Sequence, residues 1–411
     1  MSVIRDLAAV GDRVLGTAGR AVRVLRGEGP AGLARRGVRV AYRYLGVAGL
    51  DLPLLDADIA DSTTLRLPLP GSHVNRDRPM EVGWVITPPA PGSGGHTTLL
   101  RMVEATERAG HHCTLLLHDR YGGDIGRQEA VIRRWWPGVR AEVRSVEDGI
   151  TGVDACVASS WECAHVLAVR GTDPMRRLYF IQDFEPYFYP RGSLYALAED
   201  TYRFGFRCIA LGEMVARTLR REVGIAPDVT EFGCDTGVYR ILDGRPRTGV
   251  VLYARPEVPR RGYLLARMAL ERFHREHPDA DIHIYGETVD DLPFPAVQHG
   301  RMTPSQLNEL YNTCRAGLAM SFTNISLVTE EMLAAGVHVV ANDHPDARAD
   351  LPDGHVSWAA PTPGGLAEAL GRAYTAPSGD EEAIASSVRQ VGWTRAQADV
   401  VRILEEEVYG I

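Results

Sequence analysis

Two arginines and one glutamate in the second half of the chain have the residue types and spacing that suit a nucleoside diphosphate. Arg255 follows the apolar run 249–254, and Arg261 lies at the start of a predicted helix. Arginine keeps its charge and grips phosphate oxygens through paired N–H groups. Glu331 lies in the first turn of another predicted helix, where its carboxylate can accept two ribose hydroxyls. The structural alternatives are a solvated loop for the arginines and a favourable helix dipole for the glutamate.

Backbone groups near Glu331 extend this predicted phosphate site. Residues 321–326 join a strand predicted over 316–320 to the helix that contains Glu331. Successive amides at a helix entrance bind phosphate oxygens, and the helix dipole favours the negative charge. Preorganised donors of this kind stabilise the negative charge of a bound diphosphate.

A glycine turn in the first half is a candidate site for a second substrate. Gly94, Gly95 and His96 lie where a strand predicted over 81–87 leads into its helix. Glycines at such a turn let a sugar or phosphate approach closely. His96 can bind an acceptor or act on its hydroxyl proton, although a histidine at a helix start is also a common surface residue.

Two carboxylates follow a later strand of the first half. Asp183 and Glu185 come directly after the strand predicted over 177–182. Both can accept hydroxyls of an acceptor, and the alternative role for both is to cap their own loop. No general base is assigned by the sequence.

Alternating apolar strands and helices must position these groups. Such alternation implies parallel sheets that are covered on both faces, and such sheets bind ligands at the carboxyl ends of their strands. We therefore predict an α/β fold with two Rossmann-like domains that face each other across a cleft. The predicted strands are 81–87, 113–117, 153–158, 177–182, 208–212, 249–254, 281–286, 316–320 and 337–342.

Changes in composition along the chain predict its domain boundaries. A basic helical arm precedes an extended connector that is rich in proline and aspartate, and two domains and a pair of C-terminal helices follow. These segments are residues 1–50, 51–80, 81–240 (acceptor domain), 241–378 (donor domain) and 379–411.

The basic arm differs in charge from the rest of the chain. Residues 1–50 carry nine arginines and three acidic residues, a net charge of +6, whereas the whole chain has a formal charge of -8. Apolar residues between the arginines allow amphipathic helices that lie on an anionic membrane surface. The alternative is an arm that packs on the acidic body of the same protein.

The remaining composition points to a protein of the cytoplasm, with the arm as a peripheral contact to the membrane. The 411 residues include six cysteines without a CxxC pair, which indicates buried thiols rather than disulfides or a zinc site. No apolar run approaches the roughly 18 residues of a spanning helix, and no signal peptide is evident. We expect no metal and no nucleic-acid partner.

An ordered set of motifs resembles GT-B glycosyltransferases of family 4. The run from Glu331 to Val340 is similar to the donor-site signature of that family. Further similar segments, in the family's order, are 232–236, 253–255, 261–262 and 300–302. Two others, 182–186 and 201–206, resemble bacterial rhamnosyltransferases of surface-polysaccharide assembly. Together the resemblance covers roughly residues 80–375.

The resemblance implies a glycosyltransferase that uses a nucleotide sugar, linked to dTDP, UDP or GDP, without a further cofactor or metal. It implies transfer of a sugar, with rhamnose a candidate, to a glycan or lipid-linked acceptor with retention of configuration. Arg255 and Arg261 would neutralise the diphosphate and Glu331 would hold the ribose. The other donor-side residues by this resemblance are Gly233, Asp235, Met302, Asn324, Ile325 and Ser326.

The chain departs from the family pattern at two positions. Thr323 stands eight residues before Glu331, where the family usually has a glutamate that touches the donor sugar. A deoxysugar with fewer polar groups would fit this change. Arg261 stands where the family usually has lysine, and it is one residue further from Arg255 than is common.

Other functions remain alternatives at this stage. A non-catalytic sugar-nucleotide or glycan-binding protein on the same scaffold is suggested by Thr323. A nicotinamide-dependent oxidoreductase is suggested by the glycines of 92–95 and by Asp119, but Thr97 occupies the third glycine position of that fingerprint. The aspartate pairs in 56–58 and 279–281 do not lie at the strand ends that a metal-dependent transferase requires.

Overall fold

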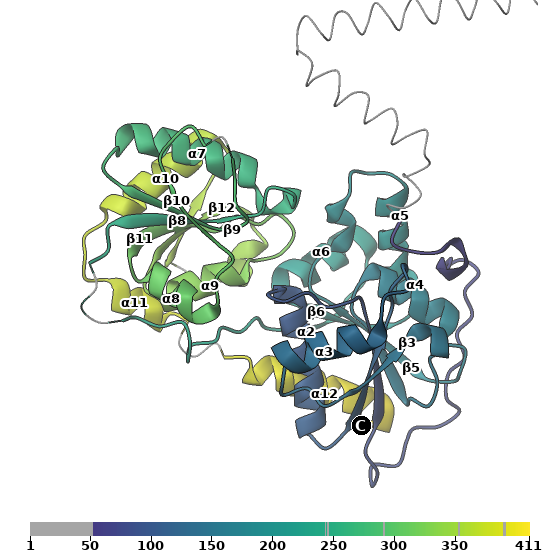
Figure 1. Cartoon of the computed structure of the whole chain (residues 1–411). Coiled ribbons are helices and arrows are strands. Elements are labelled where there is room, and N and C mark those ends of the chain that lie inside the picture. Colours follow the sequence, from purple (N-terminus) through teal and green to yellow (C-terminus); the bar gives the residue numbers. More distant parts are fainter. Residues whose placement is uncertain (1–51, 243, 245, 291, 352–353, 389–391) are drawn as a thin grey trace, which may run out of the picture. The chain divides into compact units, whose positions relative to one another are not determined.

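The computed structural model describes residues 52–242, 244, 246–290, 292–351, 354–388 and 392–411. The predicted basic arm, residues 1–50, lies outside the described residues. Residues 56–411 form one compact unit that contains two parallel sheets, which confirms the predicted fold class (Figure 1).

The first sheet has seven strands in the order β3-β2-β1-β4-β5-β6-β7, and every neighbouring pair is parallel. Its central strands are nearly continuous apolar runs, as expected for strands that are buried on both faces. The strands are β1 (Glu81–Ile86), β2 (His112–Leu117), β3 (Glu142–Ser145), β4 (Ala155–Ala158), β5 (Arg176–Ile181), β6 (Arg207–Leu211) and β7 (Asp228–Thr230).

Helices connect the strands of the first sheet. Ser93, Asp124 and Ser160 each accept a backbone N–H at the start of a helix, which satisfies donors that the first turn leaves free. The helices are α2 (Gly94–Arg108), α3 (Ile125–Trp135), α4 (Trp161–Arg170), α5 (Ser193–Asp200) and α6 (Glu213–Val223). Short 3-10 helices are η2 (Asp56–Asp58), η3 (Val146–Asp148), η4 (Glu185–Phe188) and η5 (Thr201–Arg203).

The second sheet has six strands in the order β10-β9-β8-β11-β12-β13, again all parallel. The strands are β8 (Gly249–Ala254), β9 (Asp281–Gly286), β10 (Val297–Gly300), β11 (Cys314–Leu318), β12 (His338–Asn342) and β13 (Val356–Ala359). Its helices are η6 (Pro259–Arg261), α7 (Tyr263–Glu276), α8 (Pro304–Tyr311), α9 (Leu327–Ala334), η7 (Ala347–Ala349), α10 (Pro363–Thr375) and α11 (Glu381–Ser386). At α8, Thr303 and Gln306 form a reciprocal capping box.

The four strands that the sequence did not predict are the four sheet edges, β3, β7, β10 and β13. Each has only three or four residues. An edge strand has one neighbour and is partly open to solvent, so it does not need a long apolar run. The apolar pattern therefore reveals central strands better than edges.

The last helices divide between the two sheets. Helix α11 packs against α9 of the second sheet, whereas α12 (Thr394–Tyr409) packs against α2 and β7 of the first (Figure 1). Gln397 donates to the carbonyl of Arg101 over 3.0 Å, and the Tyr409 hydroxyl donates to the carbonyl of Arg78 over 2.8 Å. The end of the chain therefore completes the first half of the fold.

From residue 56 onward, the connector packs against the first sheet's helices. Met80 is fully buried. Asp58 accepts two hydrogen bonds from the guanidinium of Arg170 in α4, at 2.6 and 2.9 Å. One carboxylate of the 56–58 pair is thus used by an ion pair within the fold.

Candidate functional site

Each sheet reverses its strand order once, between β1 and β4 in the first and between β8 and β11 in the second. At such a point the loops after the two strands run in opposite directions, and the crevice they leave is where open parallel sheets bind ligands. In the second sheet these loops are residues 255–262 and 319–326. They carry two of the three residues that the sequence singled out, and Glu331 follows on α9.

Arg261 is held between the two loops of the second sheet. Its guanidinium donates to the hydroxyl of Ser321 over 3.1 Å, and the amide of Phe322 donates to the carbonyl of Arg260 over 3.1 Å. Burial lowers the pKa of Arg261, and its neighbours Arg260 and Arg255 lower it further, whereas Asp183 opposes this change. A partly buried cation with like charges nearby is best stabilised by an anion, which supports the predicted diphosphate site.

Gly262 explains how Arg261 reaches this position. The residue has φ +63°, a left-handed conformation that glycine adopts at little cost. A Cβ there would lie 3.0 Å from side-chain atoms of Met320 and Phe322 and 3.2 Å from Met320 Cβ. The 3-10 helix η6 therefore turns into α7 directly against the end of β11.

The Arg255 guanidinium has more protein partners than that of Arg261. Its Nε lies 2.8 Å from a carboxylate oxygen of Glu287, and its Nη1 donates to the hydroxyl of Tyr253 over 3.2 Å. No ion pair to Arg261 is found in the described part of the chain. A diphosphate would therefore compete with Glu287 for Arg255 but would meet no such rival at Arg261.

The turn before α9 presents free backbone donors. Among the residues that the structure describes, no hydrogen bond is found to the amides of Asn324, Ile325 and Ser326. The turn is rigid because Asn342, at the end of β12, accepts from the amide of Ser321 over 2.9 Å and donates to its carbonyl over 2.6 Å. These rigid, free amides match the predicted phosphate-binding turn.

Glu331 lies among tyrosines that the sequence analysis missed. The Tyr311 hydroxyl is 3.4 Å from Glu331 Oε2 and 2.6 Å from the hydroxyl of Tyr285. Burial raises the pKa of Glu331 to about 7, and Asp235 contributes, whereas hydrogen bonds from Tyr239 and Tyr311 lower it. Ribose hydroxyls would supply further donors and favour the ionised carboxylate.

Asp183 lies closer to the donor loops than the sequence suggested. It is only 9% exposed, and its Oδ1 accepts from the hydroxyl of Thr323 over 2.6 Å. The side chain of Asn324 donates to the carbonyl of Gln182 over 3.2 Å. The loop after β5 is thus joined to the phosphate-binding turn.

His96 is held by its own turn. Its Nε2 lies 3.2 Å from the carbonyl of Thr87, which can only accept, so Nε2 carries the proton and Nδ1 accepts from the hydroxyl of Ser93 over 2.9 Å. Burial lowers the pKa of the imidazole, and the bond to Thr87 opposes this. Both ring nitrogens are therefore occupied. Gly95 lies against Gln182, and Gly94 lies 3.8 Å, measured from an added Cβ, from Leu327.

Glu185 also serves its own loop. Its Oε2 accepts from the backbone amide of Trp161 at the start of α4 and from the hydroxyl of Tyr179 over 2.9 Å. Burial raises the pKa of Glu185 well above its ordinary value, and the nearby Glu162 adds to this. This carboxyl fixes the loop after β5 to α4.

Gly233 and Asp235 lie in the segment between the two sheets, where they contact Trp393 and Arg101. A Cβ at Gly233 would lie 2.8 Å from the Cα and backbone nitrogen of Trp393, so only glycine allows this approach. Both carboxylate oxygens of Asp235 accept from the guanidinium of Arg101, which also lies over the Trp393 ring at 5.1 Å. Met302 is partly buried against the main apolar core. The donor roles of these three residues stay predictions.

Asp119, the residue that would bind ribose in a nicotinamide enzyme, is occupied by its own turn. Its two oxygens accept from the amides of Tyr121 and Gly123 over 2.9 and 3.0 Å. In the described residues, no group of three potential metal ligands is found, and no helix is long and apolar enough to cross a membrane.

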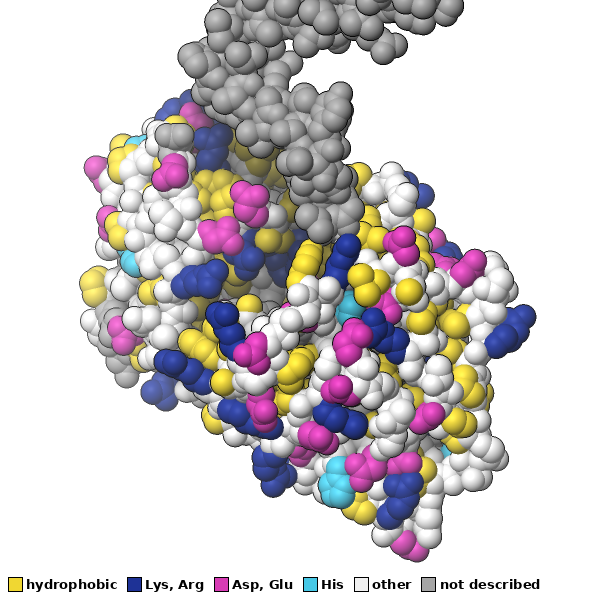
Figure 2. Space-filling model, turned by 45° about the vertical axis from the view of Figure 1, so that its right-hand side comes forward, with side chains coloured by type: hydrophobic (Ala, Val, Ile, Leu, Met, Phe, Trp, Pro, Cys, Tyr) yellow, Lys and Arg dark blue, Asp and Glu magenta, His cyan; other side chains and the backbone are white. Residues whose placement is uncertain are grey.

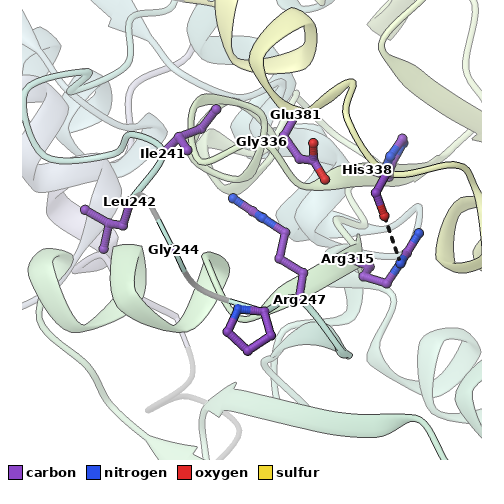
Figure 3. A pocket seen from close by; sticks show the side chains of 10 residues that line it. Ile241, Leu242, Gly244, Arg247, Arg315, Gly336, His338 and Glu381 are labelled. Atoms are coloured by element: carbon purple, nitrogen blue, oxygen red, sulfur yellow. Dashed lines mark hydrogen bonds between the residues drawn. The ribbon is translucent and has the colours of Figure 1, made fainter.

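A pocket of about 390 Å³ lies at the amino ends of the second sheet's strands, opposite to the predicted ligand loops (Figure 3). Arg247 lines it and donates to carbonyls of Tyr311, Cys314 and Ala335. His338 lies 3.1 Å from Asp380. Because Arg247 and His338 already have protein partners and the pocket lies at the amino ends of the strands, it is a poor candidate for the donor site.

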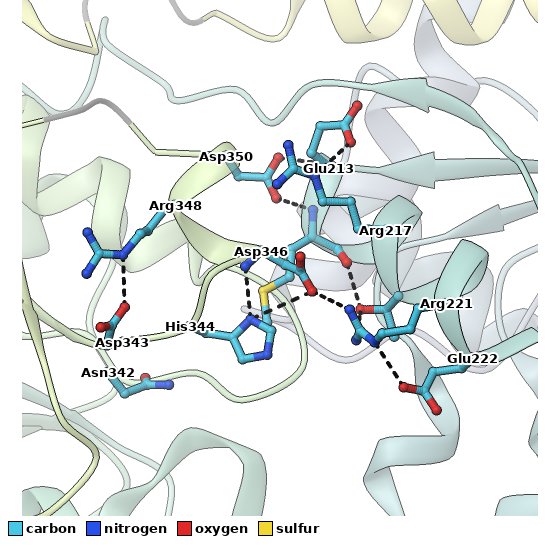
Figure 4. A network of polar contacts seen from close by, with 12 residues as sticks. Glu213, Arg217, Arg221, Glu222, Asn342, Asp343, His344, Asp346, Arg348 and Asp350 are labelled. Carbon is cyan, nitrogen blue, oxygen red and sulfur yellow. Dashed lines mark hydrogen bonds and ion pairs between the residues drawn. The ribbon is translucent and has the colours of Figure 1, made fainter.

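A polar network joins α6 to the loop after β12 (Figure 4). Asp350 accepts from the amides of Glu213 and Met214 at the start of α6, over 2.5 and 2.8 Å. Arg221 reaches from α6 to Asp346 over 2.6 Å. Burial raises the pKa of Asp350 to about 6, and the two backbone hydrogen bonds oppose this. Acidic and basic side chains lie close together over much of the face drawn in Figure 2.

Comparisons with known proteins match parts of both halves of the chain. Two family models match, described as the N-terminal domain of WsaF over residues 155–213 and the C-terminal domain of WsaF over residues 248–371. The O-antigen biosynthesis protein RfbC of Myxococcus xanthus is 28% identical over 327 residues, which cover 76% of this chain. The chain spans about a quarter of the length of that relative, because the match covers 26% of it.

Solved structures show the same fold at low identity. Sucrose-phosphate synthase of Thermosynechococcus elongatus has a TM-score of 0.60 at 12% identity, covering 79% of this chain and 98% of its own. A glycosyltransferase of Rickettsia africae has a TM-score of 0.60 at 12% identity, with 81% and 100% covered. Anabaena HepE in complex with UDP-glucose has a TM-score of 0.59 at 14% identity, with 81% and 100% covered. The chain therefore has the GT-B fold, and parts of both halves match the two domains described for WsaF.

Proposed function

We propose that this chain transfers a sugar from a nucleoside-diphosphate sugar to a glycan or lipid-linked acceptor in surface-polysaccharide assembly. The observation that carries the proposal is the shared position of Arg261, the free amides of residues 324–326 and Glu331 at one switch point. These groups supply a cation, hydrogen-bond donors and a ribose acceptor. UDP-glucose in the structure of HepE, which has the same fold, supports the class of donor.

The chemistry of this site is the stabilisation of charge. As the bond between the sugar and the diphosphate breaks, negative charge grows on the phosphate oxygens next to Arg261 and the amides. Donors that are already fixed in place need no reorganisation, and each contributes on the order of a hundredfold to a thousandfold. Gly262 and Asn342 hold the two loops in that arrangement.

The finer assignments also belong to this proposal. Rhamnose is the proposed sugar, by resemblance of residues 182–186 and 201–206 to rhamnosyltransferases. Transfer with retention and without a metal follows from the likeness to family 4. The proposed location is the cytoplasm, with residues 1–50 as a contact to anionic lipid. Deletion of residues 1–50 should abolish flotation with anionic liposomes, and unchanged flotation would exclude that role.

A non-catalytic sugar-nucleotide or glycan-binding protein is the second candidate. Thr323 favours it, because this residue cannot supply the carboxylate usual at its position and its hydroxyl is already bound to Asp183. The two candidates differ in one measurable property, since only an enzyme releases nucleoside diphosphate from the donor.

Thermal melting with a panel of nucleoside-diphosphate sugars tests the proposal. A ligand at a hundred times its Kd stabilises the native state by about 2.7 kcal/mol, so a true donor should raise Tm by a few degrees. Release of nucleoside diphosphate should then be followed with the same donor and with glycan acceptors. Stabilisation without release supports the binding protein, and no stabilisation by any nucleotide sugar contradicts both candidates.

A further inference from the structure

The carboxylate of Asp183 lies beside the predicted diphosphate site although it comes from the first sheet. It follows β5, and Thr323 holds its Oδ1 over 2.6 Å. Asn324 fixes the preceding residue by donating to the carbonyl of Gln182. Two adjacent contacts of this kind define the position of the carboxylate closely, so its placement is set by the same turn that offers amides to phosphate.

Asp183 also interacts with Arg261 without pairing with it directly. Its charge stabilises the protonated guanidinium of Arg261 against burial. Within the described residues, however, no ion pair within 4 Å joins them, and no hydrogen bond is found to Asp183 Oδ2. Both groups therefore keep hydrogen-bonding capacity for a ligand that lies next to them.

The chemical groups of a nucleoside-diphosphate sugar indicate which part of the ligand would contact Asp183. Arg261 and the amides of the turn attract the diphosphate, and a carboxylate is repelled by phosphate oxygens. The sugar is joined to the diphosphate through a single oxygen, so it occupies the space next to the phosphates. An ionised carboxylate only accepts hydrogen bonds, and sugar hydroxyls are the donors available there.

We propose that Asp183, oriented by Thr323, accepts a hydrogen bond from a hydroxyl of the donor sugar and so determines which sugar is transferred. This inference rests on the proposed function, and it moves Asp183 from the acceptor to the donor. The second sheet binds the nucleotide, and the first sheet supplies the carboxylate that selects the sugar. Thr323 acts as a positioning residue because it contacts Asp183 rather than the substrate.

Single-deoxy donor analogues test the proposal. The wild-type chain should prefer the hydroxylated donor to one deoxy analogue by roughly 10- to 100-fold in kcat/KM, because a hydrogen bond to a charged group is lost. Asp183→Asn should lower kcat/KM for the hydroxylated donor by a similar factor and reduce its preference over that analogue to within about threefold. Thr323→Val should reduce the preference partly, and Thr323→Ser should restore it.

Two controls separate this role from others. Asp173→Asn changes an exposed carboxylate of the same half of the chain and should leave every constant unchanged. The Kd of nucleoside diphosphate without sugar should stay within about threefold in the Asp183 and Thr323 variants. If Asp183→Asn keeps the full discrimination among donors, or changes only the KM of the acceptor, the inference is wrong while the proposed function stands. If the wild-type chain binds no nucleotide sugar, the proposed function itself fails.

Discussion

The loops at the carboxyl ends of the two sheets use their polar groups differently. In the second sheet, Arg261 and the amides of residues 324–326 keep donors for which the described residues supply no acceptor. In the first sheet, both ring nitrogens of His96 are occupied within its own turn, and Glu185 after β5 accepts from Trp161 of α4 and from Tyr179. Polar residues at the carboxyl ends of strands are therefore of two kinds, and only the partners of each side chain distinguish a binding group from one that builds the loop.

Removal of the Arg261 side chain should lower the rate of sugar transfer more than any other proposed change. Arg261→Ala removes a cation that has no direct ion-pair partner among the described residues, so we expect kcat to fall by about 100- to 1000-fold with a correctly folded chain. Arg255→Ala should cost less, because Glu287 already neutralises that side chain. Arg275→Ala, at the exposed end of α7, is the control. Steady-state rates of sugar transfer measure all three, and wild-type rates in Arg261→Ala would refute the donor site.

Glu331 should make donor affinity depend on pH. The pKa of its carboxyl is raised to about 7, and ribose hydroxyls donate more strongly to its ionised form. Affinity for a nucleoside-diphosphate sugar should therefore rise about tenfold as pH increases from 6 to 8, since the fraction of ionised carboxylate increases over that range. Calorimetric titrations of wild type, Glu331→Gln and the exposed control Glu309→Gln measure it. A slope that survives in Glu331→Gln would assign the titration to another group.

Glu185 should matter more for stability than for catalysis. Glu185→Ala leaves the amide of Trp161 and the hydroxyl of Tyr179 without their acceptor, which costs about 1–3 kcal/mol of unfolding free energy. The rate per folded molecule should change less than about tenfold. Thermal melting and the acceptor KM distinguish the roles, because a raised KM with an unchanged Tm would show that Glu185 binds the acceptor. His96→Ala gives the same comparison for the turn after β1.

Glu330 gives the smallest expected effect. It is 2% exposed, its Oε2 lacks a hydrogen bond, and burial together with Asp350 and Glu331 raises its pKa to about 8. Between about pH 4.5 and 8 the folded chain holds a proton that the unfolded chain has lost, so stability falls as pH rises. Glu330→Gln should weaken this fall in stability. The difference in Tm between the variant and the wild type should be about 2 °C more favourable to the variant at pH 8.5 than at pH 6. Glu309→Gln should leave the slope unchanged, and so would Glu330→Gln if this carboxyl were solvated.

The choice of arginine at position 261 follows from composition as well as from the site. The printed sequence contains no lysine, so all 45 basic residues are arginine. Lysine at this position of the family and Arg261 here both provide a cation, but the planar guanidinium can also donate to Ser321 while it faces a ligand. Arg261→Lys therefore offers a milder variant that keeps the charge and loses the bond.

The apolar runs of the central strands determined the fold class. Runs such as 249–254 and 337–342 are long enough to be read as strands buried on both faces, and Thr303 with Gln306 marked a helix start locally. Arg255, Arg261 and Glu331 were found because residues after a parallel strand meet at one edge of the sheet. The sequence did not predict the edge strands, because partly exposed strands lack a continuous apolar run.

Only the tertiary structure decided which polar residues are free. The contact between Thr323 and Asp183 joins residues 140 positions apart, and Tyr311 reaches Glu331 from another helix. Asn342 carried a local signal, a polar residue at the end of an apolar strand, but its partner Ser321 did not. A hydrogen bond forms between atoms that the fold brings within about 3 Å, and a sequence states which groups can bond without stating which groups meet.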